Sequence, residues 1–234
     1  CSQSRGLGDV YKRQELRVLA HLSKDKNMIS MLKNRDADIH SETAARIFNM
    51  DINSVSKDMR RKAKEVNFGL IYGMESFGLS KSLDIPKKEA TELIDSYFNQ
   101  FPKIKGYLDS IVKNAESSTF TETLYGRKRF IRELASSNFQ LKAMGKRIAM
   151  NAPIQGTASD IMKISMIKLE DKIKKLNSTD IILQIHDEII IQTPDDIASK
   201  TAKLVQKEME NATVLDVPLY VDIKQNKNLA NFNN

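Results

Sequence analysis

One stretch of the chain, residues 60–74 (RRKAKEVNFGLIYGM), constrains the fold more than any other. Arg60, Lys64 and Phe68 recur every four residues, and Tyr72 continues the series with more drift. Because an α-helix advances about 100° per residue, each step of four drifts by only about 40°, so a helix carries these side chains on one face. The other side is apolar and consists of Ala63, Val66, Leu70 and Ile71. The pattern predicts a helix that docks on a core by this apolar side.

The polar face of this helix suits a phosphorylated ligand. Two fixed cations one turn apart match a polyphosphate, and a ring one turn further along suits a base or a sugar. A solvated basic face with Phe68 half buried explains the same spacing, so spacing alone leaves both interpretations open. Gly69 and Gly73 each cost about 1 kcal/mol relative to alanine inside a helix. We therefore expect a close approach or a helix end at these two positions.

The order of these residues carries more information than their spacing. The string RxxxKxxxFxxxYG, with NFG inside it, resembles the nucleotide-binding fingers helix of family A DNA polymerases, the class of bacterial repair polymerases. The related single-subunit RNA polymerases differ after the lysine, so the string favours the DNA enzyme. The resemblance implies that Arg60 and Lys64 neutralise a triphosphate and that Lys64 is also catalytic, protonating pyrophosphate. It further implies that Phe68 and Tyr72 pack on the nucleotide and the template base.

Composition narrows the class of protein only weakly. The 234 residues carry a net charge of +7 and a pI of about 9.3, which suits a polyanionic partner without requiring one. Cys1 is the only cysteine, which argues against a disulfide framework and a thiolate metal site and favours a reducing, cytoplasmic location. No apolar run approaches membrane-spanning length and no signal peptide is visible, so we expect no membrane partner.

The first 14 residues (CSQSRGLGDVYKRQ) have neither helical nor strand periodicity. They resemble a translated sequencing-library adapter, so we expect a non-native, disordered leader that plays no part in the fold. A genuine flexible N-terminus is the alternative.

From Glu15 the chain reads ELRVLAH, which predicts a helix and resembles the end of the family's first palm motif, DYSQIELRVLAH. That motif has a catalytic Asp five residues before the Glu, where this chain has Val10. Asp9 is a poor substitute, because a shift of one residue in a strand turns a side chain to the opposite face. The first metal-binding carboxylate is therefore predicted to be missing. By resemblance, Glu15 would lie under the sugar of the incoming nucleotide, exclude a 2′-hydroxyl and hydrogen-bond Tyr72; an exposed first-turn Glu is the alternative.

Residues 36–48 (DADIHSETAARIF) predict a helix capped by Asp38 or Ser41. We prefer a cap to a metal site for Asp38 and His40, because two ligands without a third bind a metal weakly. The string DIHxxTA resembles the family segment whose His approaches the triphosphate, which implies that His40 is a lesser nucleotide contact. Two amphipathic helices, starting at Pro86 and after Pro102, complete an all-helical region.

Residues 119–131 alternate and turn near Tyr125-Gly126, which predicts a hairpin. The string TLxGRxR after the turn resembles the family segment that grips the primer–template backbone, which makes Arg127 a DNA-phosphate contact. Residues 139–152 predict a helix that Pro153 breaks, and residues 159–175 predict another. The string RxxxNAPxQGT resembles the family's primer–template helix and implies that DNA is contacted by Arg147, Asn151 and Gln155.

The segment IILQIHDEIIIQ (residues 181–192) reads as two buried strands flanking an acidic turn. It resembles the family's second palm motif. Adjacent carboxylates on a rigid turn give hard oxygen ligands for Mg²⁺. The resemblance thus makes Asp187 a catalytic metal ligand, Glu188 an auxiliary one, and His186 a DNA contact. A helix at residues 197–209 and a strand through Val217, Leu219, Val221 and Ile223 follow.

The sequence predicts an α+β fold. After the leader (1–14) we expect the start of a palm helix (15–24), helical fingers (25–118) and part of an antiparallel-sheet palm (119–234). The implied activity is that of a monomeric DNA-directed DNA polymerase in replication or repair, with a two-metal Mg²⁺ site that is incomplete here. Its partners would be primer–template DNA and deoxynucleoside triphosphates. The fragment is expected to be inactive, because the first-motif Asp and the thumb are missing. The alternatives are a non-catalytic nucleic-acid-binding module and a nucleotide-binding structural subunit.

Overall fold

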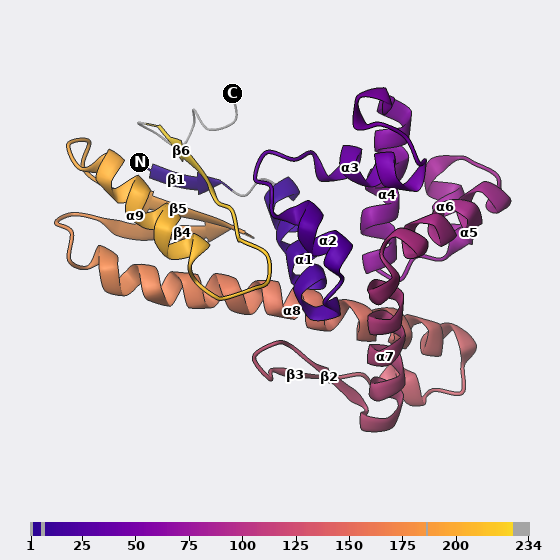
Figure 1. Ribbon diagram of the computed structural model, residues 1–234. Coiled ribbons are helices and arrows are strands. Elements are labelled where there is room, and N and C mark those ends of the chain that lie inside the picture. The colour runs from indigo at the N-terminus through magenta and orange to yellow at the C-terminus, as the bar shows by residue number, and fades with distance from the viewer. Residues whose placement is uncertain (1, 6–7, 186, 227–234) are drawn as a thin grey trace. The chain divides into compact units, whose positions relative to one another are not determined.

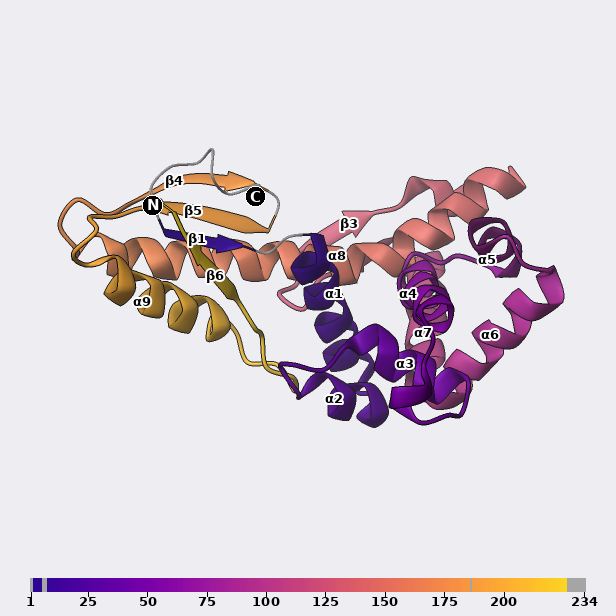
Figure 2. The ribbon, with the colours of Figure 1, turned by 90° about the horizontal axis from the view of Figure 1, so that it is seen from above.

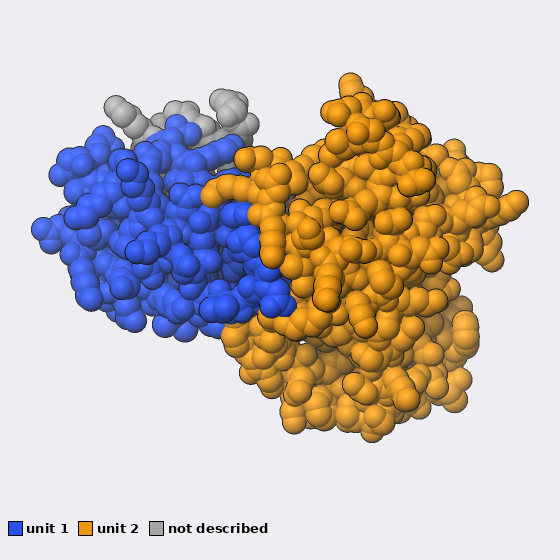
Figure 3. Space-filling view, viewed as in Figure 1, with its two compact units in different colours: residues 1–17, 158–234 blue, residues 18–157 orange. Residues whose placement is uncertain are grey.

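The computed structural model describes residues 2–5, 8–185 and 187–226, and these fall into two compact units (Figures 1 and 3). Unit 1 comprises residues 1–17 and 158–234, and unit 2 comprises residues 18–157. Helices α1 (Gly8–Ser23) and α8 (Phe139–Ile173) each contribute residues to both units. Helices joined to small antiparallel sheets confirm the α+β fold class.

Unit 2 is built from short amphipathic helices that pack against one another (Figures 1 and 2). They are α2 (Lys26–Leu32), α3 (Ile39–Ile47), α4 (Lys57–Ile71), α5 (Ser76–Leu83), α6 (Lys87–Gln100) and α7 (Pro102–Ser118). Single 3₁₀ turns occur at Ile52–Ser54 and Arg132–Ala135. The core of unit 2 includes apolar residues from α6 to α7, and Tyr97, Phe101 and Ile104 are all nearly inaccessible. The central helix, the Asp38 cap and the pair of helices around Pro102 are thus present as predicted.

The predicted hairpin forms from β2 (Phe120–Glu122) and β3 (Lys128–Phe130). A cluster of buried residues joins α7, the end of the hairpin and α8, and its members are Ile111, Ala115, Ile131, Leu134 and Ala149. Residues 119–157 therefore belong to the same compact unit as α2–α7, whereas the sequence places the boundary at residue 118.

Helix α8 runs without interruption through Pro153, so the predicted break at this residue is wrong. Proline has no N–H and cannot donate to the carbonyl of Ala149, which typically costs about 3 kcal/mol in a helix interior. Ala149, Ala152 and Ile154 are buried on both sides of the proline. We attribute the continuity of the helix to this packing, which offsets one missing hydrogen bond.

Unit 1 contains a four-stranded antiparallel sheet in the order β4-β5-β1-β6. Its strands are β1 (Ser2–Arg5), β4 (Asp180–Ile185), β5 (Glu188–Gln192) and β6 (Asp222–Gln225). Helix α9 (Ala198–Glu210) lies against β1 and β6. Met162 and Leu169 of α8, Ile189 and Ile191 of β5 and Val205 of α9 share one core. The last strand starts later than predicted, at Asp222, because its partner β1 ends opposite this residue and the backbone of Val221 bonds side chains of α9 instead.

The N-terminal residues differ from the predicted irregular leader. Residues 2–5 form β1, which pairs with β5 on one side and β6 on the other, and α1 already begins at Gly8. A strand ladder is made by backbone groups, so a segment without an apolar pattern can occupy it. The adapter origin of these residues stays a prediction.

Asp25 ties the start of two helices together. One carboxylate oxygen accepts from the N–H of Met28 in α2 at 3.0 Å, and the other accepts from the N–H of Lys103 in α7 at 3.0 Å. Its side chain is almost completely buried, at 1% exposure. A single carboxylate thus satisfies N–H groups of two helix N-termini that are 75 or more residues apart in sequence.

We predict that Asp25→Ala lowers the free energy of unfolding by about 2–4 kcal/mol, because two helix caps are lost and the buried N–H of Met28 is left without its acceptor. Urea denaturation of the purified chain measures this change. Asp51→Ala is the matched control, since Asp51 is an exposed cap of the Ile52–Ser54 turn alone; it should cost less than about 1 kcal/mol. Equal losses in the two variants would contradict the double-cap interpretation.

Candidate functional site

The candidate nucleotide-binding residues lie along α4. Ser56 caps this helix by accepting from the N–H of Met59, and the helix ends at Ile71. Tyr72 therefore stands just beyond the last turn, where its N–H bonds the carbonyls of Phe68 and Gly69. Arg60 and Lys64 are partly exposed, whereas Phe68 is 8% exposed. The alternative interpretation, a solvated basic face, expects Phe68 to be half buried, whereas its ring is largely buried.

Arg60 is paired with a carboxylate from the neighbouring helix. Its Nε lies 2.6 Å from Oδ2 of Asp38, and its Nη2 lies 3.2 Å from Oδ1, so the contact is two-pronged. The same carboxylate caps α3 by accepting from the N–H of His40 at 3.2 Å and from the hydroxyl of Ser41 at 2.7 Å. Both charged side chains remain close to 40% exposed, so solvent screens the pair.

The environment of Asp38 keeps it ionised. Partial burial alone would raise its pKa, but hydrogen bonds from Arg60, Ser41 and the His40 backbone, with the Arg60 charge, lower the pKa from 3.8 to about 2. A lowered pKa in the folded state means that the stabilisation is complete above about pH 4 and is lost as the pH falls through about 2. The ion pair is therefore intact at neutral pH.

A buried polar network joins α3 to α4 beside this ion pair. Nδ2 of Asn67, which is fully buried, donates to the hydroxyl of Thr43 at 3.0 Å and lies 3.3 Å from Nδ1 of His40. The His40 ring meets the Phe68 ring edge to face, with centroids 5.2 Å apart. His40, predicted from one string, is thus brought together with Arg60 and Phe68, predicted from another, on one helix pair. Sequence reasoning took Asp38 only as a cap and missed its contact with Arg60.

Gly73 allows α4 to end against α8. Its φ of +69° is a left-handed conformation that favours glycine. A Cβ built on it would collide with the methyl group of Met150 and come within 3.0 Å of Arg147 Cγ. Gly73 thus provides both the helix end and the close approach that its position predicts.

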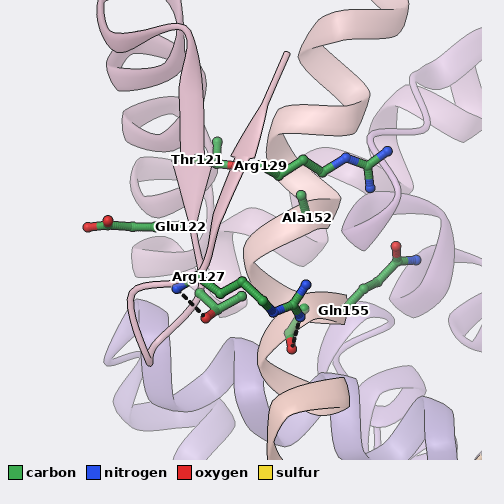
Figure 4. Close-up of a pocket in the computed structure, with 8 residues that line it drawn as sticks. Thr121, Glu122, Arg127, Arg129, Ala152 and Gln155 are labelled. Carbon is green, nitrogen blue, oxygen red and sulfur yellow. Dashed lines mark hydrogen bonds between the residues drawn. The ribbon is translucent and has the colours of Figure 1, made fainter.

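A second group of candidate residues lines a small cavity of about 70 Å³ between the hairpin and α8 (Figure 4). Arg127, Arg129 and Gln155 all border it, although sequence reasoning had selected only the first and the last. Arg129 could have been found from the RxR spacing, because residues two apart in a strand share a face. Glu122 also borders the cavity, although its side chain points away from α8 in Figure 4.

The hairpin is fastened to α8 by hydrogen bonds. Nη2 of Arg127 donates to the carbonyl of Gly156 at 3.0 Å, and its N–H donates to the hydroxyl of Thr123 at 3.2 Å (Figure 4). The N–H of Leu124 donates to the hydroxyl of Thr157 at 2.9 Å. These contacts give Arg127 a fixed orientation rather than that of a solvated turn.

The continuity of α8 places Arg147, Asn151 and Gln155 at steps of four on a single helix, so they share a face. Arg147 is exposed and the other two are half-buried. Oδ1 of Asn151 is buried and has no hydrogen-bond partner among the described residues. The face therefore offers one guanidinium and two amides toward a ligand.

The acidic turn belongs to unit 1. Ile185 pairs with Glu188, so β4 and β5 form the predicted hairpin, with Glu188 as the first residue of β5. The prediction that both strands are buried is wrong for β4, because β4 is the edge strand of the sheet and its residues are mostly exposed. Asp187 and Glu188 are half-buried next to the fully buried core of β5, whereas His186 lies outside the described residues. No group of three or more His, Cys, Asp and Glu able to hold a metal occurs in the described part of the chain. Two adjacent carboxylates on a tight turn suit Mg²⁺, which keeps several waters and needs few protein ligands.

Glu15 is fully buried within α1, so the alternative of an exposed first-turn glutamate is wrong. Two residues on, Arg17 donates from Nη1 to the carbonyl of Pro218 at 2.8 Å and lies over the ring of Tyr220. Val10 lies in the described helix, where the family motif has its catalytic Asp. Within the described ranges, no helix is long and apolar enough to cross a bilayer.

Comparison of the sequence with known protein families identifies the family of this chain. The model for "DNA polymerase family A" matches residues 7–231. The chain belongs to DNA polymerase family A. Among curated relatives, DNA polymerase I of Caldicellulosiruptor bescii is 48% identical over 219 residues, covering 93% of this chain and 26% of that protein. DNA polymerase I of Bacillus subtilis is 45% identical over 213 residues, covering 91% and 24%.

Solved family A polymerases agree with this assignment. The polymerase domain of Pol1 from M. smegmatis, in complex with a DNA primer-template and dNTP, has a TM-score of 0.85 and 37% identity. The match covers 95% of this chain and 38% of that one. This chain therefore spans about a quarter of the length of its curated family A relatives.

We predict that Gly73→Ala destabilises this family A chain by about 2–4 kcal/mol, from about 1–2 kcal/mol of left-handed strain plus the clash with Met150 and Arg147. Gly126→Ala isolates the strain, because Gly126 has a φ of +78° and no atom within 4 Å of an added Cβ. Thermal and urea unfolding of both variants measure the difference. Similar losses for the two would show that α8 does not approach Gly73 closely.

Proposed function

We propose that this chain is the nucleotide- and template-binding part of a DNA-directed DNA polymerase. The reaction is transfer of a nucleotide from a deoxynucleoside triphosphate to a primer 3′-hydroxyl, in DNA replication or repair. The observation that carries the proposal is the gathering of His40, Arg60, Lys64 and Phe68 on the packed helices α3 and α4. The names of the relatives and the ligands of the Pol1 structure support it.

In this proposal, the face of α4 binds and orients the triphosphate. Arg60 and Lys64 would neutralise phosphate charge, and Lys64 would give a proton to the departing pyrophosphate. Phe68 and Tyr72 pack on the nucleotide and the template base. The T-shaped contact with His40 holds the Phe68 ring in one orientation, and His40 itself is a lesser phosphate contact. Buried Glu15 would exclude a ribose 2′-hydroxyl and hydrogen-bond Tyr72.

Polymerases of this family are metal-dependent enzymes. We propose Mg²⁺ as the ion, with Asp187 as ligand and Glu188 as auxiliary ligand, because adjacent hard carboxylates fit its preferences. When bound, the ions lower the pKa of the primer hydroxyl and hold the leaving pyrophosphate. The chain carries Val10 where the family motif supplies a further carboxylate, so the two-metal site is incomplete.

The second half of the proposal is a DNA interface on α8 and the hairpin. Arg147, Asn151 and Gln155 present a guanidinium and two amides along one helix face, a chemistry that reads minor-groove edges without distinguishing most sequences. Arg127 and Arg129 border the neighbouring cavity and would contact backbone phosphates. His186 completes the proposed DNA contacts. A polymerase needs readout of this kind, because it must accept every correct base pair.

The proposal also covers the subdomain boundaries, the oligomeric state and the cellular location of the protein. Residues 25–118 would form the fingers and residues 119–234 the palm, and the protein would act as a cytoplasmic monomer. The single cysteine supports a reducing compartment.

A non-catalytic nucleic-acid-binding module is the second candidate, and Val10 is the observation that favours it. We predict that the chain as it stands extends a primer–template with Mg²⁺ and deoxynucleoside triphosphates little or not at all. Replacing residues 10–14 (VYKRQ) by the motif DYSQI in an intact family A polymerase that carries this chain should restore extension. If the polymerase remains inactive after this replacement, the result supports the non-catalytic binding module. Robust extension by the original chain would contradict the prediction that Val10 removes an essential carboxylate.

Lys64→Ala tests the nucleotide site itself. We predict that the variant binds a deoxynucleoside triphosphate about 10- to 100-fold more weakly, because a charge-assisted contact to phosphate is lost. Lys88→Ala removes the same charge from an exposed position on α6 and should change affinity less than about twofold. Equilibrium titration with a fluorescent triphosphate measures both. Affinity that is insensitive to Lys64→Ala would favour a structural nucleotide-binding subunit.

A further inference from the structure

We propose that Asp38 is an internal competitor for phosphate at Arg60, and that it thereby sets the affinity of the α3–α4 face for a nucleoside triphosphate. The inference rests on the proposed nucleotide site but goes beyond it. It assigns a role in setting affinity to a carboxylate that, by its sequence, is only the N-cap of α3.

The competition follows from which edge of the guanidinium is used. Arg60 donates from Nε to one oxygen of Asp38 and from Nη2 to the other. This pair of parallel hydrogen bonds is the arrangement in which a guanidinium also grips a phosphate. Asp38 and a phosphate group therefore compete for the same two N–H donors of Arg60, and a phosphate can bind them only after Asp38 has released them.

Charge adds to the competition. The carboxylate of Asp38 is ionised at neutral pH and lies next to the first cation of the face that would receive a polyanion. Its repulsion of phosphate is moderate, because Asp38 and Arg60 are 38% and 43% exposed and water screens them. A ligand with a single phosphate gains one contact by displacing Asp38. A triphosphate that also reaches Lys64 gains more, so it can still bind after meeting the cost of displacing Asp38, whereas a single phosphate binds weakly.

Asp38 could instead act only by holding α3 in place, and the structure separates these two roles. Its cap consists of hydrogen bonds accepted from the N–H of His40 and the hydroxyl of Ser41. A neutral asparagine or serine can still cap the helix, since both are favoured N-cap residues. Neither can hold a guanidinium by charge. Asp38→Asn and Asp38→Ser thus remove the competitor while keeping the cap.

The test is equilibrium binding of a deoxynucleoside triphosphate, inorganic tripolyphosphate and inorganic phosphate to the full chain at low salt. We expect each Asp38 variant to bind tripolyphosphate and the nucleotide roughly two- to tenfold more tightly than the original chain. Inorganic phosphate should gain by a similar factor, because every ligand that occupies the Arg60 fork must displace the same carboxylate. Melting temperatures identify the variant whose fold is better preserved, and that variant decides.

Two controls connect the effect to Arg60. Asp58→Asn removes the same charge from the first turn of α4, where Asp58 pairs with Arg61 and Lys62 instead; it should leave affinity within about twofold. In the double variant Asp38→Asn/Arg60→Ala, the gain in affinity from Asp38→Asn should vanish, because the N–H donors that Asp38 occupies are no longer present.

Unchanged or weaker binding by a folded Asp38 variant would overturn the inference, as would an equal gain in Asp58→Asn. If Lys64→Ala weakens binding while the Asp38 variants do not strengthen it, this inference fails and the nucleotide site stands. If neither the original chain nor the Asp38 variants bind nucleotide or tripolyphosphate, both proposals fail.

Discussion

The packing of α3 on α4 is the interaction on which the candidate nucleotide site depends. Asn67 is completely buried, so its amide must find partners inside the protein or its burial is costly. Thr43 and His40 of α3 supply them. A slide of one helix along the other would break these hydrogen bonds, so they fix the register of the pair. That register in turn brings the Phe68 ring to His40 and the Arg60 guanidinium to Asp38.

The same contacts connect stability with ligand binding. Asp38 accepts a hydrogen bond from an N–H at the start of α3 and neutralises Arg60 of α4, so one carboxylate contributes to both helices. A binding site built from unpaired cations would attract any anion. Without a bound anion, its positive charges would repel one another and destabilise the folded state. Pairing the first cation with a half-exposed carboxylate avoids both problems, because the pair is weak enough to be exchanged for phosphate.

Much of the helical architecture could be predicted from local patterns. The apolar face in residues 60–71, the two amphipathic helices on either side of Phe101 and the cap at Asp38 are short-range signals, and each is present in the structure. The two apolar runs on either side of the HDE segment also pair as β4 and β5. The helix end at Gly73 was anticipated as well, since glycine inside a helix needs a reason.

The failures share a different cause, because they depend on contacts distant in sequence. Pro153 stays inside α8 since buried neighbours on both sides hold the helix together, and no local rule reports such packing. Strand β1 forms through backbone pairing with β5 and β6, and its polar side chains give no sequence pattern from which this pairing could be predicted. The Arg60–Asp38 pair joins residues 22 positions apart on two helices, and only the tertiary register creates it.

The most direct test of this account is to map which backbone amides respond when a deoxynucleoside triphosphate is added to the isotope-labelled chain, by nuclear magnetic resonance titration. The account predicts that the largest chemical-shift changes fall in residues 38–43 and 60–72, the facing parts of α3 and α4. Shift changes confined to other segments, or none at millimolar nucleotide, would contradict the claim that this helix pair forms the nucleotide site.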